Sequence, residues 1–250
     1  MSTEQIIVVG LVLMAGSALQ SAVGFGFGLM AIPLMIWAGV PLPMAVTVLA
    51  IATVAQMGWS CWQYRVDLAW RPAIPMVVVR LVSLPAGVYL LSLLAEADEG
   101  LIRQVVGAML LGVLALQFGL RVDPRPRVHP GWLVLAGSSS GVLGGLIGMG
   151  GPPVILWLMA HDWPARQTRS FLWLTVLAVM PLNLLLLWHH FGQPVVEASV
   201  VGLAYTPLVL AGTMAGLWGG DLLSKPRLRA ATLALLVVIA VSSIVTPWVL

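Results

Sequence analysis

The sequence Gly24-Phe-Gly-Phe-Gly28 lies in the middle of an apolar run over residues 6–40, and Gly144-Gly-Leu-Ile-Gly-Met-Gly-Gly-Pro-Pro153 interrupts a second apolar run over residues 132–160. As single helices these runs would be about 50 Å and about 43 Å long, at about 1.5 Å per residue. The hydrocarbon core of a bilayer is only about 30 Å thick. Glycine weakens a helix, and proline removes one of its backbone hydrogen bonds. The sequence therefore predicts that each run is two half-helices joined by unwound backbone.

The composition places both runs in a membrane. Only 8% of the 250 residues are charged and 60% are hydrophobic, whereas an average soluble domain has about 25% charged residues. These values exclude a soluble globular domain, and the high hydrophobicity excludes a disordered chain. The basic residues behind the net charge of +3 are scattered among apolar runs, so no nucleic-acid partner is expected. Cys61 is the single cysteine, so no intrachain disulfide is expected.

The chain also shows a weak internal repeat. Gly24-x-Gly26 aligns with Gly148-x-Gly150, and Ala86-Gly87 aligns later with Ala215-Gly216. This collinear match predicts an all-α polytopic membrane protein of two halves, each a broken segment followed by three helices. The N-terminal repeat covers 1–122, with the broken segment 6–40 and helices over 43–61, 73–95 and 100–120. A cytoplasmic linker covers 123–131. The C-terminal repeat covers 132–250, with the broken segment 132–160 and helices over 167–190, 198–223 and 228–249.

The distribution of positive charge indicates how the broken segments sit in the membrane. If every run crossed once, Lys and Arg would be divided almost evenly between the two sides. If each broken segment enters and leaves on one side, all but one of the cations between the runs fall together, and Arg103 alone lies opposite. The cations that fall together are Arg65, Arg71, Arg121, Arg125, Arg127, Arg166, Arg169, Lys225, Arg227 and Arg229.

Cytoplasmic loops of membrane proteins carry an excess of Lys and Arg. We therefore predict re-entrant hairpins, inverted halves and both termini outside, in a cell membrane such as the bacterial inner membrane. A full double crossing by each broken segment gives the same sidedness and stays open.

Inverted halves with broken helices are typical of secondary transporters. Free backbone N–H groups at a break, with a helix N-terminus behind them, make an anion site. We expect such N-termini near Leu29 and near Val154. The predicted substrate-binding residues are therefore the two glycine clusters and the polar residues before them: Gln20, Ser21, Gly24, Gly26, Gly28, Ser139, Ser140, Gly148, Gly150 and Gly151. Small residues also line ordinary helix contacts, and Gly212-x-x-x-Gly216-x-x-x-Gly220 is interpreted as one.

Three further residues complete the predicted site. Arg80, inside an apolar run, carries a countercharge for an anion or extends to the membrane surface. Gln56 and Asn183 line the pathway or form hydrogen bonds between helices. The apolar runs lack a central Asp or Glu, and the chain has no G-x-x-x-x-G-K-[ST] and no H-E-x-x-H motif, so an enzyme is not expected. No metal and no cofactor is expected.

The two glycine motifs resemble those of the sulfite exporter TauE/SafE family of membrane permeases. The resemblance rests on Ser21-Ala-Val-Gly-Phe-Gly-Phe-Gly-Leu-Met-Ala-Ile-Pro33 and Gly141-Val-Leu-Gly-Gly-Leu-Ile-Gly-Met-Gly-Gly-Pro-Pro153. The downstream Leu84-Pro-Ala-Gly87 and Gly107 also fit the usual layout of the family. It covers nearly the whole chain, and the second motif departs from the family pattern at Pro152-Pro153. The resemblance implies transport, often outward, of sulfite, sulfonates or related sulfur oxyanions.

We therefore expect a secondary transporter, most simply an exporter, of small sulfur-containing or organic anions. Its partners are a small anionic substrate and the lipid bilayer, and assembly into a homo-oligomer is left open. The alternatives are a non-transporting membrane scaffold or subunit of a larger complex, which predicts tightly packed glycines without a polar cavity, and a membrane enzyme.

Overall fold

The computed structural model describes residues 3–63, 70–119, 128–222 and 225–249, and within these ranges it contains twelve α-helices and no strand. Six helices are long and apolar enough to cross a membrane, and the bent pair α10–α11 makes a seventh span if counted as one. The all-α membrane class predicted from composition is thus confirmed. Most of the expected linker lies outside the described residues, as do Arg65, Arg121, Arg125 and Arg127 and the side chains of Lys225, Arg227 and Arg229.

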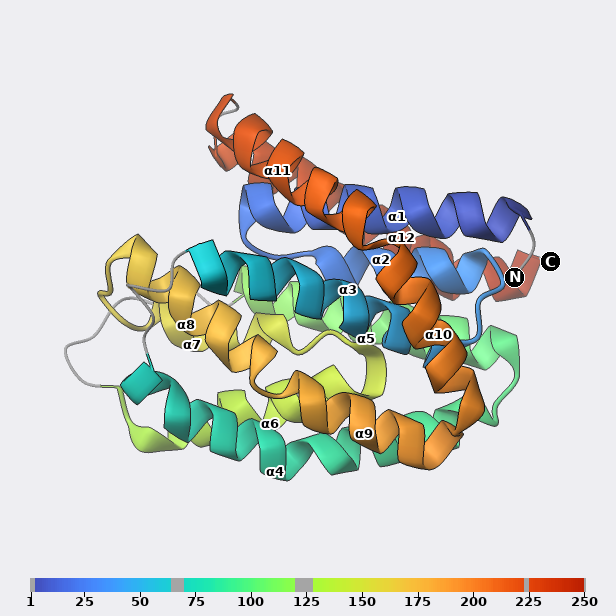
Figure 1. Ribbon diagram of the computed structural model, residues 1–250, viewed down its shortest axis with the longest axis horizontal. Helices are drawn as coiled ribbons and strands as arrows, with labels where there is room; N and C mark the ends of the chain where they lie inside the picture. Colours follow the sequence, from blue (N-terminus) through green and yellow to red (C-terminus); the bar gives the residue numbers. More distant parts are fainter. Residues whose placement is uncertain (1–2, 64–69, 120–127, 223–224, 250) are drawn as a thin grey trace.

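Most of the helices run along one axis of an elongated bundle (Figure 1). In the first half these are α1 (Thr3–Val23), α2 (Phe27–Trp37), α3 (Leu42–Gln63), α4 (Trp70–Ala95) and α5 (Glu99–Gly119). In the second half they are α6 (Pro130–Ile147), α7 (Gly151–Met159), α8 (Ala165–Leu177), α9 (Met180–Phe191), α10 (Gln193–Ala204), α11 (Thr206–Leu222) and α12 (Lys225–Val249).

The glycine clusters break both long runs, but the two arms of each run are unequal. The first arms, α1 and α6, have 21 and 18 residues, or about 31 Å and about 27 Å of helix. The second arms, α2 and α7, have 11 and 9 residues, or about 16 Å and about 14 Å. The expected pairs of half-helices are therefore corrected to a full-length first arm and a short second arm. The short arms begin at Phe27 and Gly151, slightly before the expected Leu29 and Val154.

Each broken run begins and ends at the same end of the bundle. In Figure 1, α1 runs leftward from the N-terminus and α2 returns to the right, whereas α6 runs rightward and α7 returns to the left. Both chain termini lie at the right end. Helices α3, α5, α7 and α11 end at the left end, and α4, α6, α8 and α12 begin there. We call it the basic end because α4 and α8 begin there with Arg71, Arg166 and Arg169.

Prolines divide two of the helices that we expected to be continuous. The expected helix 167–190 is one apolar span, Arg166–Phe191, that is interrupted between α8 and α9 and is one of the six spans counted above. Pro181 explains the interruption because its ring clashes with the carbonyl four residues earlier, at Leu177, where α8 ends. The expected helix 198–223 is α10 and α11, which meet at an angle of 50°. Pro207 opens α11 and excludes a continuous hydrogen-bond ladder there in the same way.

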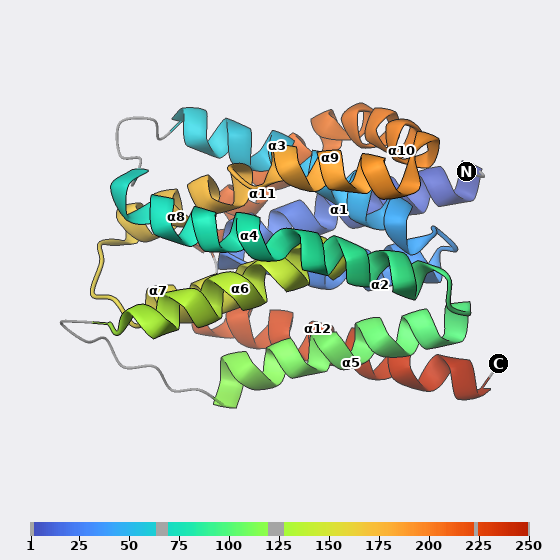
Figure 2. The same cartoon turned by 90° about the horizontal axis from the view of Figure 1, so that it is seen from below.

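Glycines set the two closest helix pairings, α1 with α11 and α4 with α6. A Cβ added at Gly216 would overlap the backbone of Ala18, and one added at Gly212 would overlap that of Met14. On the other side of the bundle, a Cβ at Gly145 would lie 2.7 Å from the Leu84 carbonyl oxygen. The interpretation of Gly212 and Gly216 as a helix contact is confirmed. Figure 2 shows that α5 and α12 also lie side by side.

Helix α2 occupies the centre of the bundle. Eight of its eleven residues are buried, among them Phe27, Ile32 and Met35. A short helix that is apolar on every side is stable only when protein surrounds it. The N-terminus of α2 at Gly26 and Phe27 is therefore held inside the molecule, whereas Gly24, the first residue of the glycine cluster, is exposed.

Replacing Gly216 by alanine should lower the stability of the protein in detergent by about 1–3 kcal/mol, because overpacking forces α1 and α11 apart. Thermal unfolding of the purified variant measures this loss. Gly219→Ala is the matched control, since a Cβ there meets nothing within 4 Å; equal effects of the two substitutions would contradict the packing role of Gly216.

Candidate functional site

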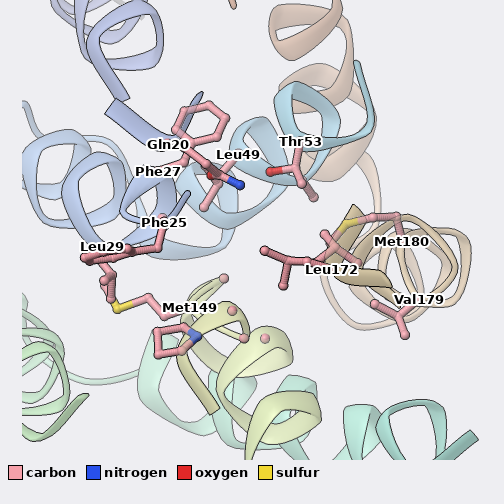
Figure 3. Close-up of a pocket in the computed structure, with 18 of the residues that line it drawn as sticks. Gln20, Phe25, Phe27, Leu29, Leu49, Thr53, Met149, Leu172, Val179 and Met180 are labelled. Carbon is pink, nitrogen blue, oxygen red and sulfur yellow. The ribbon is translucent and has the colours of Figure 1, made fainter. Parts of the chain in front are cut away.

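The two helix breaks meet at one cavity of about 80 Å³ (Figure 3). Nine of the thirteen predicted site residues line it: Gln20, Gly24, Gly26, Gly28, Arg80, Gly148, Gly150, Gly151 and Asn183. The other walls come from α3, α8 and α9, with Thr53, Leu172 and Met180 among them. Segments more than 100 residues apart in the sequence thus enclose one space.

The breaks approach each other through backbone alone. A Cβ added at Gly28 would lie 2.7 Å from the carbonyl oxygen of Gly148, which is closer than real Cβ atoms come. Gly24, Gly26 and Gly148 have φ angles of 94°, 112° and 67°, in the left-handed region that favours glycine. Glycine is therefore required at this crossing both by backbone conformation and by lack of space.

The N-termini of α2 and α7 both line the cavity. The first N–H groups of a helix have no acceptor within the helix, and its N-terminus carries partial positive charge. Gly26 precedes α2 and has no side chain to accept from them. In α7 the donors are fewer, because Pro152 and Pro153 lack N–H groups. The first break therefore presents more backbone donors than the second.

Arg80 places a positive charge beside the second break, which has fewer backbone donors. Its side chain is only 2% exposed, and a Cβ added at Gly150 would lie 3.2 Å from its Nη2. Its Nη1 donates to the carbonyl oxygen of Thr175 at 2.6 Å, while its Nε has no partner. Among the described residues that line the cavity, none is an aspartate or a glutamate. The site thus holds a buried cation that no carboxylate of the cavity wall neutralises.

The break between α8 and α9 explains why the Thr175 carbonyl is available. In a continuous helix it would accept from the N–H of Val179, four residues later. Val179 instead donates to Val176 at 3.3 Å. The proline-induced break therefore supplies an acceptor that holds the Arg80 guanidinium at the cavity.

Other polar side chains surround the space. Asn183 is 3% exposed and its Oδ1 has no hydrogen-bond partner. In Figure 3 the Gln20 carboxamide and the Thr53 hydroxyl point toward one another from α1 and α3. Thr53 was not among the predicted site residues, although it lies three residues before Gln56 on the same face of α3, a spacing that could have indicated it.

The remaining predicted residues lie elsewhere. Ser21 and Gln56 line a second cavity of about 60 Å³, where the Gln56 Nε2 donates to the Ser21 hydroxyl at 3.0 Å and to the Ser17 carbonyl at 3.1 Å. Ser139 and Ser140 line neither cavity. The Ser139 hydroxyl donates to Leu135 in its own helix at 2.7 Å. The buried Ser140 hydroxyl donates to the carbonyl of Gly150 and so supports the second break from behind.

Ser140→Ala should therefore lower stability in detergent by about 1–3 kcal/mol, because the buried Gly150 carbonyl loses its partner. Ser139→Ala, one residue earlier, should change it by less than about 0.5 kcal/mol. Thermal unfolding of the two variants distinguishes them, and an equal loss in both would refute the supporting role of Ser140.

Comparison with known proteins places the chain in a family. The model of the family described as "Sulfite exporter TauE/SafE" matches residues 8–243. The chain is 24% identical over 209 residues to a protein of Cupriavidus necator named "Probable sulfite/organosulfonate exporter TauE", a match that covers 81% of this chain and 79% of that protein. No solved structure matches the chain significantly. With a family match over almost its whole length, on a bundle of apolar spanning helices, the chain belongs to the sulfite exporter TauE/SafE family of membrane transporters.

Proposed function

We propose that the protein is a secondary transporter that exports small sulfur-containing anions, with sulfite and short organosulfonates as the substrate class. The observation that carries the proposal is the buried Arg80 guanidinium at the cavity where both helix breaks meet. A buried cation is costly without a partner, and an oxyanion would supply one. The Cupriavidus necator relative, named as a probable sulfite/organosulfonate exporter, supports the substrate class.

The proposed binding mode uses donors from both halves. One oxygen of the anion accepts from the N-terminus of α2, around Phe27 and Gly28, and another accepts from Arg80 beside Gly150. Gln20 and Asn183 supply further polar contacts. Sulfite and the sulfonate group carry several acceptor oxygens on one centre, which suits donors that converge from opposite sides. A cavity of about 80 Å³ favours a headgroup of a few non-hydrogen atoms.

The scaffold alternative is less favoured by this geometry. It requires glycine clusters packed together without a polar cavity. The clusters do pack together at Gly28 and Gly148, but they also border a space that contains Arg80, Gln20 and Asn183. A purely structural contact offers no reason for an arginine whose Nε has no partner.

We further propose that the two halves are inverted repeats, with the basic end in the cytoplasm and both termini outside. The pairings α1 with α11 and α6 with α4 support this, because the first helix of each half packs on the third run of the other. The aligned residues Gly87 and Gly216 each sit against backbone in these pairings. The positive-inside rule supports the orientation, and a bacterial inner membrane is the expected location.

Sulfite uptake into proteoliposomes by the purified protein tests the substrate class, and a panel of short sulfonates and carboxylates sets its limits. If the protein transports another anion but neither binds nor transports any sulfur oxyanion, sulfite and the sulfonates are not its substrate class.

Arg80→Gln should reduce anion binding roughly 10- to 100-fold, since hydrogen bonds to charged groups contribute about 1.5–3 kcal/mol. Arg80→Lys should retain part of the affinity because the charge remains. Anion affinity measured by tracer exchange, with thermal unfolding to verify folding, gives the comparison. Gly112→Ala is the control, since a Cβ there meets nothing within 4 Å; full transport by a folded Arg80→Gln would remove Arg80 from the site.

A further inference from the structure

The second cavity adjoins the first and extends it in one direction. The two cavities share Gln20, Gly24 and Leu172 as lining residues. Gln20 and Leu172 project from α1 and α8 toward the space between them (Figure 3). These two side chains therefore form the boundary between the cavities.

Helix α3 shows the direction of this extension. Its lining residues Val46, Leu49, Ala50 and Thr53 face the first cavity, and Gln56, Met57, Ser60 and Gln63 face the second. These positions recur every three or four residues, so they share one face of the helix. From Thr53 onward the stripe is mainly polar, and over about 15 Å it reaches Gln63, the exposed last residue of α3 at the basic end.

The other walls of the second cavity combine apolar side chains, Leu172, Trp173 and Leu217, with polar ones. Ser21 comes from α1, Thr213 from α11 and the exposed Arg169 from the first turns of α8. Gln56 is 2% exposed, and its Oε1 has no partner. A buried carboxamide with an unmade hydrogen bond is costly in an apolar wall, whereas beside a hydrated passage water can complete it.

The opposite side of the first cavity has no comparable polar stripe among the described residues. Val46 and Leu49 of α3 are buried there. Leu187, one turn beyond Asn183 in α9, is fully buried. The central cavity is thus bordered by apolar side chains toward the end that holds the chain termini and by polar ones toward the basic end.

We infer that the second cavity is the passage by which the anion reaches the central site from the basic end, with Arg169 as its outermost anion contact and Gln20 and Leu172 as its inner boundary. This inference rests on the proposed function and adds the route and the entry side to it. A cation at the mouth raises the local concentration of anions and their rate of entry. Entry from the cytoplasm fits an exporter, and the structure corresponds to the conformation that receives substrate from that side.

The single cysteine permits a direct test that needs no sulfite. Cys61→Ala removes the native thiol, and Ser60→Cys then places one thiol in the passage. Val48→Cys is the matched control, because Val48 lies on the same helix, is 2% exposed and lines neither cavity. The probes are the anionic 2-sulfonatoethyl methanethiosulfonate and its trimethylammonium analogue, applied separately to right-side-out and inside-out vesicles that contain the full-length protein.

We expect Ser60→Cys to react only from the basic end, and at least about tenfold faster with the anionic than with the cationic probe once intrinsic thiol reactivity is divided out. Arg169→Gln in the same background should remove most of this preference, and Val48→Cys should not react. Labelling no faster than Val48→Cys, or equal from both sides, overturns the passage; a preference unchanged by Arg169→Gln overturns the role of Arg169.

Transport assays separate this inference from the proposed function. Charge-selective labelling without sulfite or sulfonate transport would keep the passage and reject the substrate class. Sulfite transport with an unreactive Ser60→Cys, in a folded variant, would keep the function and place the route elsewhere. A raised KM with an unchanged maximal rate in Arg169→Gln is the expected kinetic counterpart.

Discussion

The contact between the backbones of Gly28 and Gly148 is the constraint on which the rest of the structure depends. It brings two unwound segments together inside a protein whose surroundings tolerate no exposed backbone polar groups. Because no Cβ fits between Gly28 and the Gly148 carbonyl, the breaks can meet closely and still leave their helix N-termini facing one space. The glycine-mediated pairings α1–α11 and α4–α6 hold the long arms so that the short arms converge.

The buried Arg80 is the second constraint, and its position depends on the interruption between α8 and α9. A guanidinium in an apolar bundle is stable only if its donors are matched. The interruption after Leu177 leaves the Thr175 carbonyl free to accept from it. This single acceptor does not satisfy the whole group, since Nε stays without a partner. The proposed binding of an anion at this cavity rests on this remaining donor capacity beside Gly150.

The relation between the two cavities gives the site a direction. Polar residues on one face of α3 lead from Thr53 to the basic end, whereas buried aliphatic side chains border the opposite side. In an alternating-access protein the two sides exchange these roles. The reciprocal packing of the first helix of each half on the third run of the other is an arrangement that such an exchange can use.

Much of this architecture could be predicted from local patterns. Composition alone indicated a polytopic membrane protein, since 8% charged residues cannot cover a soluble surface. The glycine clusters predicted both breaks, because glycine and proline oppose helix formation whatever surrounds them. The positive charges between the apolar runs predicted that each broken segment returns to the side from which it enters. In the structure α2 runs opposite to α1, and α7 runs opposite to α6 (Figure 1). Each of these rests on a rule that acts on neighbouring residues or on the bilayer.

Tertiary structure decided what depends on neighbours distant in sequence. Ser139 and Ser140 are indistinguishable in the sequence, yet only Ser140 supports Gly150, because the rotation of α6 against the break selects it. Thr53 lines the first cavity and Gln56 the second because the position of each along α3 places it beside a different segment. Arg80 lies at the cavity and not at the membrane surface, where its guanidinium donates to the free Thr175 carbonyl of α8. The sequence by itself determined where the chain must unwind; the packing of α1 on α11 and α6 on α4 decided that both unwound segments face the same cation.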